Sequence, residues 1–473
     1  MARDLAPRRV GDGSMFAFAV AASSPLTVLV GGMVATFAAT GIVGVPLSFL
    51  VLGAVLWLPA VGYAAMSRRV GSAAPFYAVM ARGLGPASGV TAGTVALVAY
   101  NCIQVSLYGL LGHTASGLVG GPWWGWSLLM WAVVAVLGLA HVELNAKVLL
   151  AALAVEVVLI LLFDVVAIAS PAGGSLDTGP LFDPATLLVD GVGGVFALGI
   201  AAFVGFETAP IYAEEARSER AAGRATLAAV VFLGGFYAVT ALGLTAAVGP
   251  AAVVDAARAG LLPMGVIQQR FGGLFADLTT ALLVLSMFAA ALSFHHSIAR
   301  YTYAMARENV LPGRLARTSG GVRGGTPVGG SVVQSVGAFA VIVGFAAAGV
   351  DPFTGLFVWL STIGALGVLT LVVATTVAVL AFYRTEPAAP EPLWTRTVSP
   401  LLGLLAGGAV LVVVVVNTGA VLGTAPGSAL AAVPALVIPA AAAPGWGGGP
   451  GLNGRSKLVT SRTNLFIAGC RVR

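Results

Sequence analysis

The sequence predicts an all-α protein that crosses a membrane about twelve times. Of its 473 residues, 58% are hydrophobic and only 9% are charged, whereas soluble domains carry about 25% charged residues. The apolar residues form continuous runs close to the ~20 residues that one membrane-spanning helix needs. A β-barrel is excluded, because its strands are segments of about ten residues with alternating polarity.

These apolar runs define twelve helices in order along the chain, and the last is short. Spanning helices satisfy all their backbone hydrogen bonds internally, as the lipid interior requires. The predicted spans are residues 15–39, 43–67, 87–112, 124–142, 147–170, 191–213, 223–248, 274–304, 329–350, 353–383, 398–423 and 427–443.

The positions of Lys and Arg predict the orientation of these helices. With the N-terminus inside, only Arg258 and Arg270 of the 24 Lys and Arg residues fall in outer loops. Basic residues concentrate on the cytoplasmic side of membrane proteins, so both termini are expected in the cytoplasm. Topology thereby explains the net charge of +6, and the lipid bilayer rather than nucleic acid is the expected partner.

Two spans are interrupted by residues that break helices. Span one contains Ser23, Ser24 and Pro25, and span six contains Gly205, Glu207 and Pro210. Interrupted helices at matching positions of two halves indicate an inverted-repeat transporter. Five helices per half is an odd number, so the second half crosses the membrane with the opposite polarity.

The expected organisation has five parts. They are a cytoplasmic segment at 1–14, a first repeat of helices 1–5 at 15–170, a second repeat of helices 6–10 with its leading outer loop at 171–383, helices 11–12 at 384–444, and a disordered cytoplasmic tail at 445–473.

Four stretches carry a resemblance to a known family. They are AASSPLTVLVGG in span one, YNCIQVSLYGLLG in span three, GFETAPIYAEEAR in span six and ARYTYAMARENVLP at the end of span eight. Over residues 10–425 the chain resembles permeases of the amino acid–polyamine–organocation (APC) superfamily. The resemblance implies a five-plus-five core, two further helices, and uptake or exchange of amino acids or related amines.

Two departures from the family pattern concern the substrate. Many members carry a Gly-Ser-Gly-like run at the first break, where this chain has Ala22-Ser23-Ser24-Pro25. Some antiporters of the family carry a tryptophan gate just before the break in span six, where this chain has Ala201-Ala202.

The paired breaks predict a site for a small zwitterion or amine. The outer half of span one would begin near Leu26 and turn its N–H groups and positive end toward a carboxylate. Free carbonyl groups near Phe203 would face an ammonium group, and Gly205 allows the backbone to leave helical geometry there. The substrate-binding candidates are Ser23, Ser24, Pro25, Leu26, Asn101, Gln104, Phe203, Gly205, Phe206 and Glu207.

Several of these candidates have two interpretations. Asn101 and Gln104 lie on or beside a polar stripe of span three and either contact substrate or bridge helices. A charge at mid-bilayer costs roughly 2.5–3.5 kcal/mol, so Glu207 should face protein. Glu207 either has a functional role, in which it tunes amine binding or titrates, or it accepts hydrogen bonds from backbone N–H groups freed by the break in span one. Phe203 or Phe206 is a gate over the substrate, or both are packing residues.

Glu156 is a second acid within a span. The resemblance implies that it falls near a position where several sodium-independent members carry a lysine, at the place of a sodium ion in sodium-coupled relatives. Desolvation favours the neutral form of an acid, so Glu156 either relays a proton during transport or is a structural carboxyl. Asp164 in the same span is expected to be an interfacial or packing residue.

No motif for catalysis, metal binding or a cofactor is found. The sequence contains no HExxH or GxSxG pattern, and the adjacent residues His295 and His296 point in different directions on a helix. We therefore expect a plasma-membrane secondary transporter of amino acids, proton-coupled and working by alternating access. The alternatives are an exchanger, a polyamine or organocation permease, and a nutrient sensor that does not transport.

Overall fold

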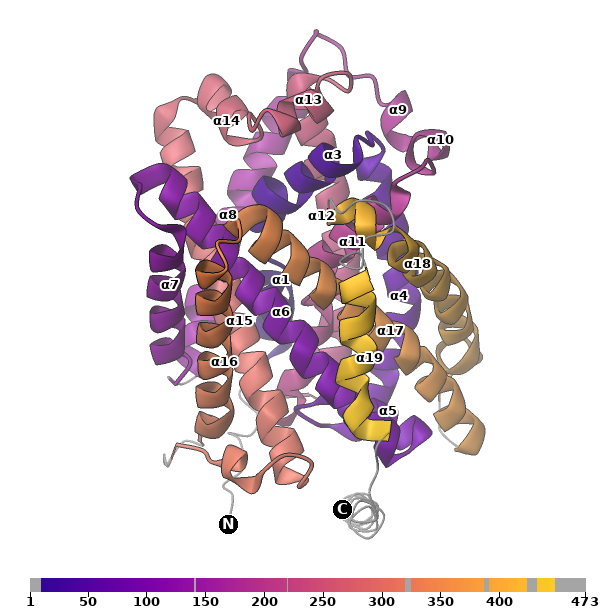
Figure 1. The fold of residues 1–473 in the computed structure, drawn as a ribbon. Helices are drawn as coiled ribbons and strands as arrows, with labels where there is room; N and C mark the ends of the chain where they lie inside the picture. Colours follow the sequence, from indigo (N-terminus) through magenta and orange to yellow (C-terminus); the bar gives the residue numbers. More distant parts are fainter. Residues whose placement is uncertain are drawn as a thin grey trace.

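The computed structural model describes residues 10–139, 142–218, 220–319, 325–386, 391–422 and 432–446. Within these ranges the chain folds into helices, with two isolated β-bridges and no strand. The helices pack side by side into one bundle (Figure 1). The segment expected at 1–14 is described from residue 10, and the tail expected at 445–473 lies outside the described residues from 447 onward.

The first half of the chain supplies nine helical segments. These are α1 (Asp12–Ser23), α2 (Pro25–Thr27), the π-helix η1 (Val28–Met33), α3 (Val34–Thr40), α4 (Val45–Val70), α5 (Pro75–Leu84), α6 (Pro86–Val119), α7 (Trp123–Leu137) and α8 (Val142–Ala169).

The second half begins with short helices that lie at one end of the bundle. The segments are α9 (Gly179–Phe182), α10 (Pro184–Leu187), α11 (Val192–Phe203), the 3-10 helix η2 (Phe206–Glu215), α12 (Ala221–Val248), α13 (Val253–Arg258), α14 (Met264–Phe271), α15 (Gly273–Arg307), η3 (Gly313–Ala316), α16 (Val328–Ala347), the π-helix η4 (Pro352–Phe357), α17 (Val358–Thr385), η5 (Trp394–Val398), α18 (Ser399–Val421) and α19 (Val433–Trp446).

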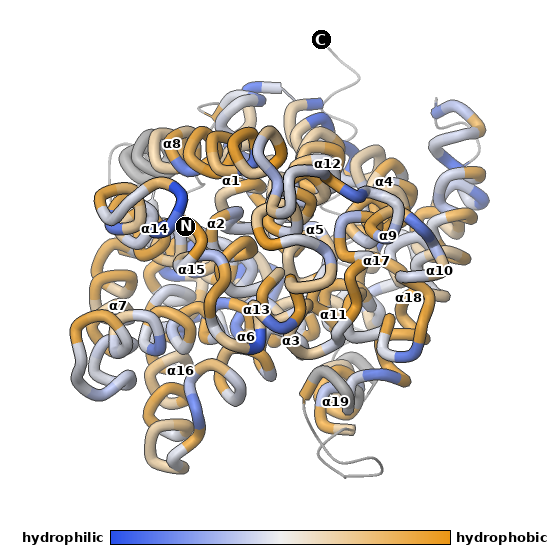
Figure 2. Tube along the Cα trace, turned by 90° about the horizontal axis from the view of Figure 1, so that it is seen from above, coloured by the Kyte–Doolittle hydropathy of each residue, from blue (hydrophilic) through white to orange (hydrophobic). Residues whose placement is uncertain are grey.

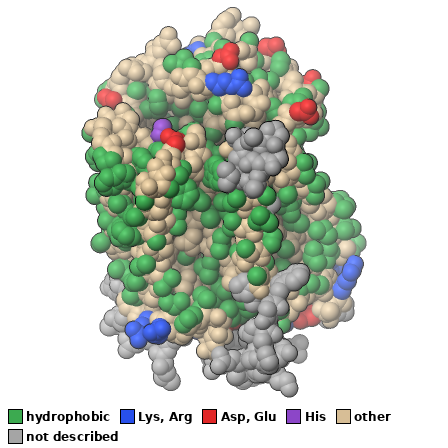
Figure 3. Space-filling model, in the orientation of Figure 1, with side chains coloured by type: hydrophobic (Ala, Val, Ile, Leu, Met, Phe, Trp, Pro, Cys, Tyr) green, Lys and Arg blue, Asp and Glu red, His purple; other side chains and the backbone are tan. Residues whose placement is uncertain are grey.

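Ten helical stretches among the described residues are long and apolar enough to cross a membrane. The predicted spans 124–142 and 427–443 correspond to α7 and α19, which are shorter helices of 15 and 14 residues. On the face drawn in Figure 3, hydrophobic side chains form a broad middle band, and most charged side chains lie near its two ends. The prediction of an all-α polytopic membrane protein is confirmed.

The two interrupted spans lie at the centre of the bundle. In the most apolar part of Val192–Glu215, 89% of the residues are buried, whereas the corresponding share in Val328–Ala347 is only 28%. Helix α1 packs against α8, α12, α15 and η2, while α7, α16, α18 and α19 lie at the rim (Figure 2). Burial without lipid contact lets the central spans carry polar and non-helical backbone. We call the face at which α1 begins the N-terminal side and the opposite face, which carries α9, α10, α13 and α14, the distal side.

Candidate functional site

The first span is broken at Ser24. Helix α1 ends at Ser23, and Ser24 has left-handed backbone angles, with φ of 53° and ψ of 72°. Pro25 begins the next turn, where proline is tolerated because the first N–H groups of a helix have no partner within it. A left-handed residue other than glycine is uncommon. Ser24 is held there by its hydroxyl, which donates to Thr27 Oγ1 at 2.6 Å and lies 2.7 Å from Ser286 Oγ.

The sixth span is broken at Gly205. Helix α11 ends at Phe203, Gly205 has φ of 126°, and the chain continues as the 3-10 helix η2. A Cβ atom at Gly205 would lie 2.8 Å from both the Cβ of Ala22 and the backbone nitrogen of Ser23. The two breaks are therefore in direct backbone contact. Glycine is required both by this contact and by the φ value, and the predicted interruption of helices one and six is confirmed.

A hydrogen bond joins the two breaks. The hydroxyl of Ser23 lies 3.2 Å from the carbonyl oxygen of Val204 and 3.4 Å from that of Phe203. These are the carbonyl groups expected to be free for an ammonium group. Each carbonyl oxygen has two lone pairs, so both keep capacity for a second donor.

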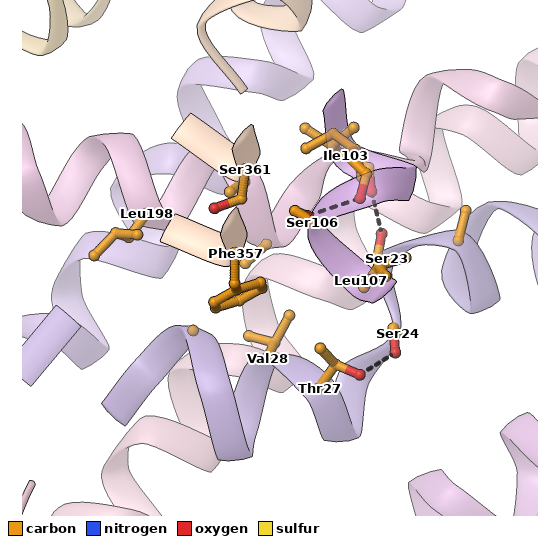
Figure 4. A pocket seen from close by; sticks show the side chains of 15 residues that line it. Ser23, Ser24, Thr27, Val28, Ile103, Ser106, Leu107, Leu198, Phe357 and Ser361 are labelled. Carbon is orange, nitrogen blue, oxygen red and sulfur yellow. Dashed lines mark hydrogen bonds between the residues drawn. The ribbon is translucent and has the colours of Figure 1, made fainter. Parts of the chain in front are cut away.

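A cavity of about 520 Å³, counted with its open space, lies against the breaks (Figure 4). Its walls come from the first span, α6, α11, and the junction of η4 and α17. Five hydroxyl side chains supply its polarity, and no ionisable side chain among the described residues lines it. The lining residues are Ala22, Ser23, Ser24, Thr27, Val28, Gly32, Ile103, Ser106, Leu107, Leu198, Ala201, Ala202, Val204, Phe357 and Ser361.

The structure brings only part of the predicted site to this cavity. Ser23 and Ser24 line it, whereas Pro25 and Leu26 are buried beside it without lining it. The backbone N–H of Leu26 donates to Glu156 Oε1. The first N–H group after the break is thus already engaged by a carboxyl group of the chain itself.

Span three presents a neighbouring face to the cavity. Asn101 is half-buried and its Nδ2 donates to the carbonyl oxygen of Leu97 at 2.7 Å. Gln104 is fully buried, donates to Tyr108 Oη at 2.9 Å, and accepts a hydrogen bond from Gln334 of α16. Gln104 was expected either to contact substrate or to bridge helices. In the structure its side chain bridges α6 and α16.

Both phenylalanines at the sixth-span break are buried. Phe203 packs against Phe49 and Tyr237, with ring centroids 6.2 Å away in each case. Phe206 is 2% exposed at the start of η2. Neither ring lines the cavity, which at this height is bounded instead by Ala201 and Ala202.

Glu207 is completely buried on η2, outside the cavity lining. Its Oε2 accepts the backbone N–H of Gly205 at 2.9 Å, so the freed backbone group that it binds belongs to its own span and not to span one. Its Oε1 has no hydrogen-bond partner among the described residues. The hydroxyl of Tyr63 donates to the backbone carbonyl of Glu207 at 3.3 Å, which ties α4 to the same break.

Glu156 reaches the first-span break from α8. Its Oε1 accepts hydrogen bonds from the backbone N–H of Leu26 and, at 2.7 Å, from Ser286 Oγ of α15. Ser286 also lies 2.7 Å from Ser24 Oγ, and Ser24 lines the cavity. A short chain of polar contacts therefore connects a buried carboxyl group to the cavity wall.

The N-terminal side of the breaks is closed by a buried ion pair. Arg300 of α15 is 1% exposed and donates through Nη2 and Nε to Glu215 Oε1, at 3.0 and 3.1 Å. Its guanidinium also lies 4.8 Å from the ring centroid of Tyr212, which stacks on Phe18 of α1. Glu214 pairs with Arg307 at 2.8 Å. Both acids therefore bind basic residues of α15.

The histidines of α15 do not form a metal cluster. His295 Nε2 lies 2.6 Å from Ser331 Oγ of α16. Across the part of the chain that the structure describes, no group of three or more His, Cys, Asp or Glu residues could hold a metal ion.

Sequence reasoning missed most of the cavity wall. Thr27 and Val28 follow the break by one turn, so extending the site along span one would have included them. Phe357 and Ser361 come from the tenth predicted span and are one helical turn apart. Phe357 ends the π-helical turn η4, which begins after Asp351, and Ser361 lies in α17. No local signal distinguished this turn from an ordinary helix start.

Comparison with known proteins decides the family. The family model for amino acid permeases matches residues 14–438, which is most of the chain. The chain belongs to the amino acid permease family. This places the permease in the APC superfamily, as the four sequence stretches indicated, and points to a transporter rather than an enzyme. A search of curated proteins finds no match.

Proposed function

We propose that this permease takes up a small neutral amino acid by proton-coupled alternating access. The cavity supports a neutral amino acid, because its lining contains hydroxyl and apolar groups and no ionisable side chain. A polyamine would bring two or more positive charges to a wall without a carboxylate, which is costly in a low-dielectric site. A zwitterion carries one charge of each sign, and backbone groups at the two breaks can meet both.

The breaks supply complementary ends for such a zwitterion. The carbonyl groups of Phe203 and Val204 end one half-helix and are suited to an ammonium group. The turn that begins at Pro25 starts the other half-helix, and its positive end is suited to a carboxylate. Ser23 and Ser24 would add hydroxyl groups at the same point.

The observation that carries proton coupling is the position of Glu156. As a carboxylate, it accepts the N–H of Leu26 and neutralises the positive end to which a substrate carboxylate would bind. Adding a proton to Glu156 removes that negative charge and leaves the helix end free to attract the substrate. Proton binding and substrate binding would then favour each other, as symport requires.

Alternating access would open the side that is now closed by Arg300 and Glu215. In our proposal each of the two repeats, 15–170 and 171–383, contributes to both a moving bundle and a fixed scaffold. Spans one, two, six and seven form the moving bundle. Spans three, four, eight and nine form the scaffold. The N-terminal side would face the cytoplasm of a plasma-membrane protein, because most Lys and Arg residues fall there.

Uptake of labelled glycine, alanine and leucine into proteoliposomes, with and without an inward proton gradient, tests the proposal. We expect gradient-driven accumulation by the native permease. Glu156→Gln keeps an acceptor for Leu26 but cannot exchange a proton, so it should abolish gradient-driven accumulation and retain counterflow. Accumulation that persists in this variant would exclude Glu156 as the coupling group.

A second candidate is an exchanger. The two donors on Glu156 Oε1 also suit a carboxylate that stays ionised throughout the cycle. An exchanger would show uptake only when the vesicles contain substrate, with no response to the proton gradient. Absence of transport of any amino acid or amine by folded protein would instead favour a sensor.

A further inference from the structure

A second buried acid lies on the same helix as Glu156. Asp164 is eight residues further along α8 toward the distal side, which is about 12 Å along the helix axis, and is 1% exposed. Its Oδ2 accepts a hydrogen bond from Thr240 Oγ1 of α12 at 3.0 Å. Its Oδ1 is buried and has no hydrogen-bond partner in the part of the chain that the structure describes. The sequence suggested only an interfacial or packing role for this residue.

The backbone of α12 comes unusually close to this carboxyl group. Gly243 lies one turn beyond Thr240, and a Cβ atom there would meet Asp164 Oδ1 at 2.6 Å and Asp164 Cα at 3.1 Å. Any larger residue would press on the unpartnered oxygen. The glycine thus leaves room for an acid that hydrogen bonding alone does not satisfy.

The ionisable groups around Asp164 leave its charge unbalanced. On α12 the nearest such side chain is Tyr237, one turn before Thr240. On α15, Asp277 is exposed near the distal end, and Arg300 is committed to Glu215. Neither α1 nor α2 places a basic residue against α8, and no ion pair involves Asp164 among the described residues. A carboxylate with one unpaired oxygen in such a place is costly, so the neutral acid is the form that fits.

A second unpartnered group lies on α12, one turn toward the N-terminal side of Thr240. The hydroxyl of Tyr237 is buried without a hydrogen-bond partner, and Tyr237 lies within electrostatic range of Glu156. Its ring is fixed against Phe49, at a centroid distance of 5.3 Å. Along the interface of α8 and α12, the order toward the distal side is Glu156, Tyr237, then Thr240 with Asp164.

The distal end of this interface is held by a fixed charge. Arg270 of α14 donates to the carbonyl oxygen of Ser170, just after α8, at 2.6 Å and to that of Ala247 in α12 at 2.8 Å. Loss of these two bonds would let the helix ends separate and admit water to Asp164.

We propose that Asp164 is a second proton-binding site, through which protons from the distal side reach Glu156. The inference rests on the proposed proton coupling at Glu156 and adds its route. The O–H bond of Asp164 breaks as the Tyr237 hydroxyl takes that proton and gives its own to the Glu156 carboxylate. Asp164 is left as a carboxylate and is protonated again from distal water, so one proton moves inward in each cycle.

Two conservative variants test the route in proteoliposomes. Asp164→Asn keeps the acceptor for Thr240, and Tyr237→Phe keeps the ring. Each should retain counterflow and slow proton-driven uptake by about tenfold or more, since a positioned proton-transfer group is worth at least that much. Tyr383→Phe is the matched control, because it removes another buried hydroxyl without a partner on α17, away from the route.

Infrared difference spectra between acidic and alkaline pH give a readout apart from transport. We expect a protonated carboxyl band in the native protein that disappears in Asp164→Asn and persists in Glu156→Gln. The route would be overturned if both Asp164→Asn and Tyr237→Phe showed the same rates and pH profiles of proton-driven uptake as the native protein. This holds even if the infrared spectra show that Asp164 binds a proton. A native permease that ignores the gradient would overturn proton coupling itself, before any variant is made.

Discussion

The hydroxyl of Ser23 lies 3.2 Å from the carbonyl oxygen of Val204, so the break in the first span binds the break in the sixth. These residues are 181 positions apart in the chain. The bond fixes the two half-helix ends relative to one another at the wall of the cavity. Its neighbour Gly205 makes that approach possible, since a Cβ atom there would overlap Ser23.

Gly205→Ala should impair both folding and transport. The φ of 126° costs a residue with a side chain about 1–3 kcal/mol, and the overlap with Ala22 and Ser23 costs about as much again. Thermal unfolding in detergent and binding of the transported amino acid measure the two effects. Gly235→Ala on α12 is the control, because a Cβ atom there meets nothing within 4 Å. Equal losses in both variants would contradict the specific role of Gly205.

Ala201→Phe should narrow the substrate range. Ala201 lines the cavity, and a phenyl ring there would compete with a bulky substrate side chain. Overpacking costs about 1–3 kcal/mol, so leucine affinity should fall by about tenfold while glycine affinity changes little. Competition against a labelled substrate measures both affinities. Ala154→Phe on the exposed face of α8 should leave them unchanged, and an equal loss for glycine and leucine would argue against this wall.

Glu215→Gln should open the N-terminal side. The substitution leaves Arg300 buried without a counter-charge, and breaking a buried pair in this way costs about 3–5 kcal/mol. A cysteine introduced at Ser293, which is 1% exposed, should then react faster with a thiol reagent added on that side, in protein lacking Cys102 and Cys470.

The control for this experiment is a partly exposed pair. Glu391 binds Arg68 at 3.0 Å with side-chain exposures of 15% and 30%, and such pairs contribute about 0–1 kcal/mol. Glu391→Gln should therefore leave the labelling rate at Ser293 as it is. An unchanged rate in Glu215→Gln as well would show that the Arg300 pair does not hold this side closed.

Asp351 should make stability depend on acidic pH. Burial alone would raise the pKa of Asp351, yet Oδ1 accepts the N–H and hydroxyl of Thr354, at 2.7 and 2.8 Å, and the N–H of Phe353, at 3.0 Å. These bonds to the carboxylate hold its pKa below the ordinary value of 3.8. A lowered folded-state pKa stabilises the fold above pH 3.8, and this contribution is lost as pH falls through the folded-state value.

Two variants distinguish the role of Asp351 as the N-cap of η4 from the role of its negative charge. Asp351→Ala removes the N-cap of η4 and should cost about 1 kcal/mol at neutral pH. Asp351→Asn keeps an acceptor but does not titrate, so its stability should vary less between pH 5 and pH 2 than that of the native protein. Thermal unfolding across this range is the measurement. An identical pH profile for Asp351→Asn would rule out the linkage.

Local patterns in the chain predicted much of this protein. The apolar runs gave the helices, because the bilayer demands both length and hydrophobicity. Ser24-Pro25 and Gly205 indicated the two helix breaks. The backbone angles that proline and glycine favour depend on the residue itself and its immediate neighbours, so such breaks can be predicted from sequence. The family, too, followed from short stretches that lie within a single span or at its end.

Contacts across the bundle could not be predicted in the same way. The orientation of α6 about its axis places Ile103, Ser106 and Leu107 at the cavity. The same orientation places Gln104 against Gln334, which is 230 residues away in the chain. The partners of Glu156 and Glu215 likewise come from other helices. Side-chain spacing along one helix shows which residues share a face, but the identity of the neighbouring surface depends on how all the helices pack together.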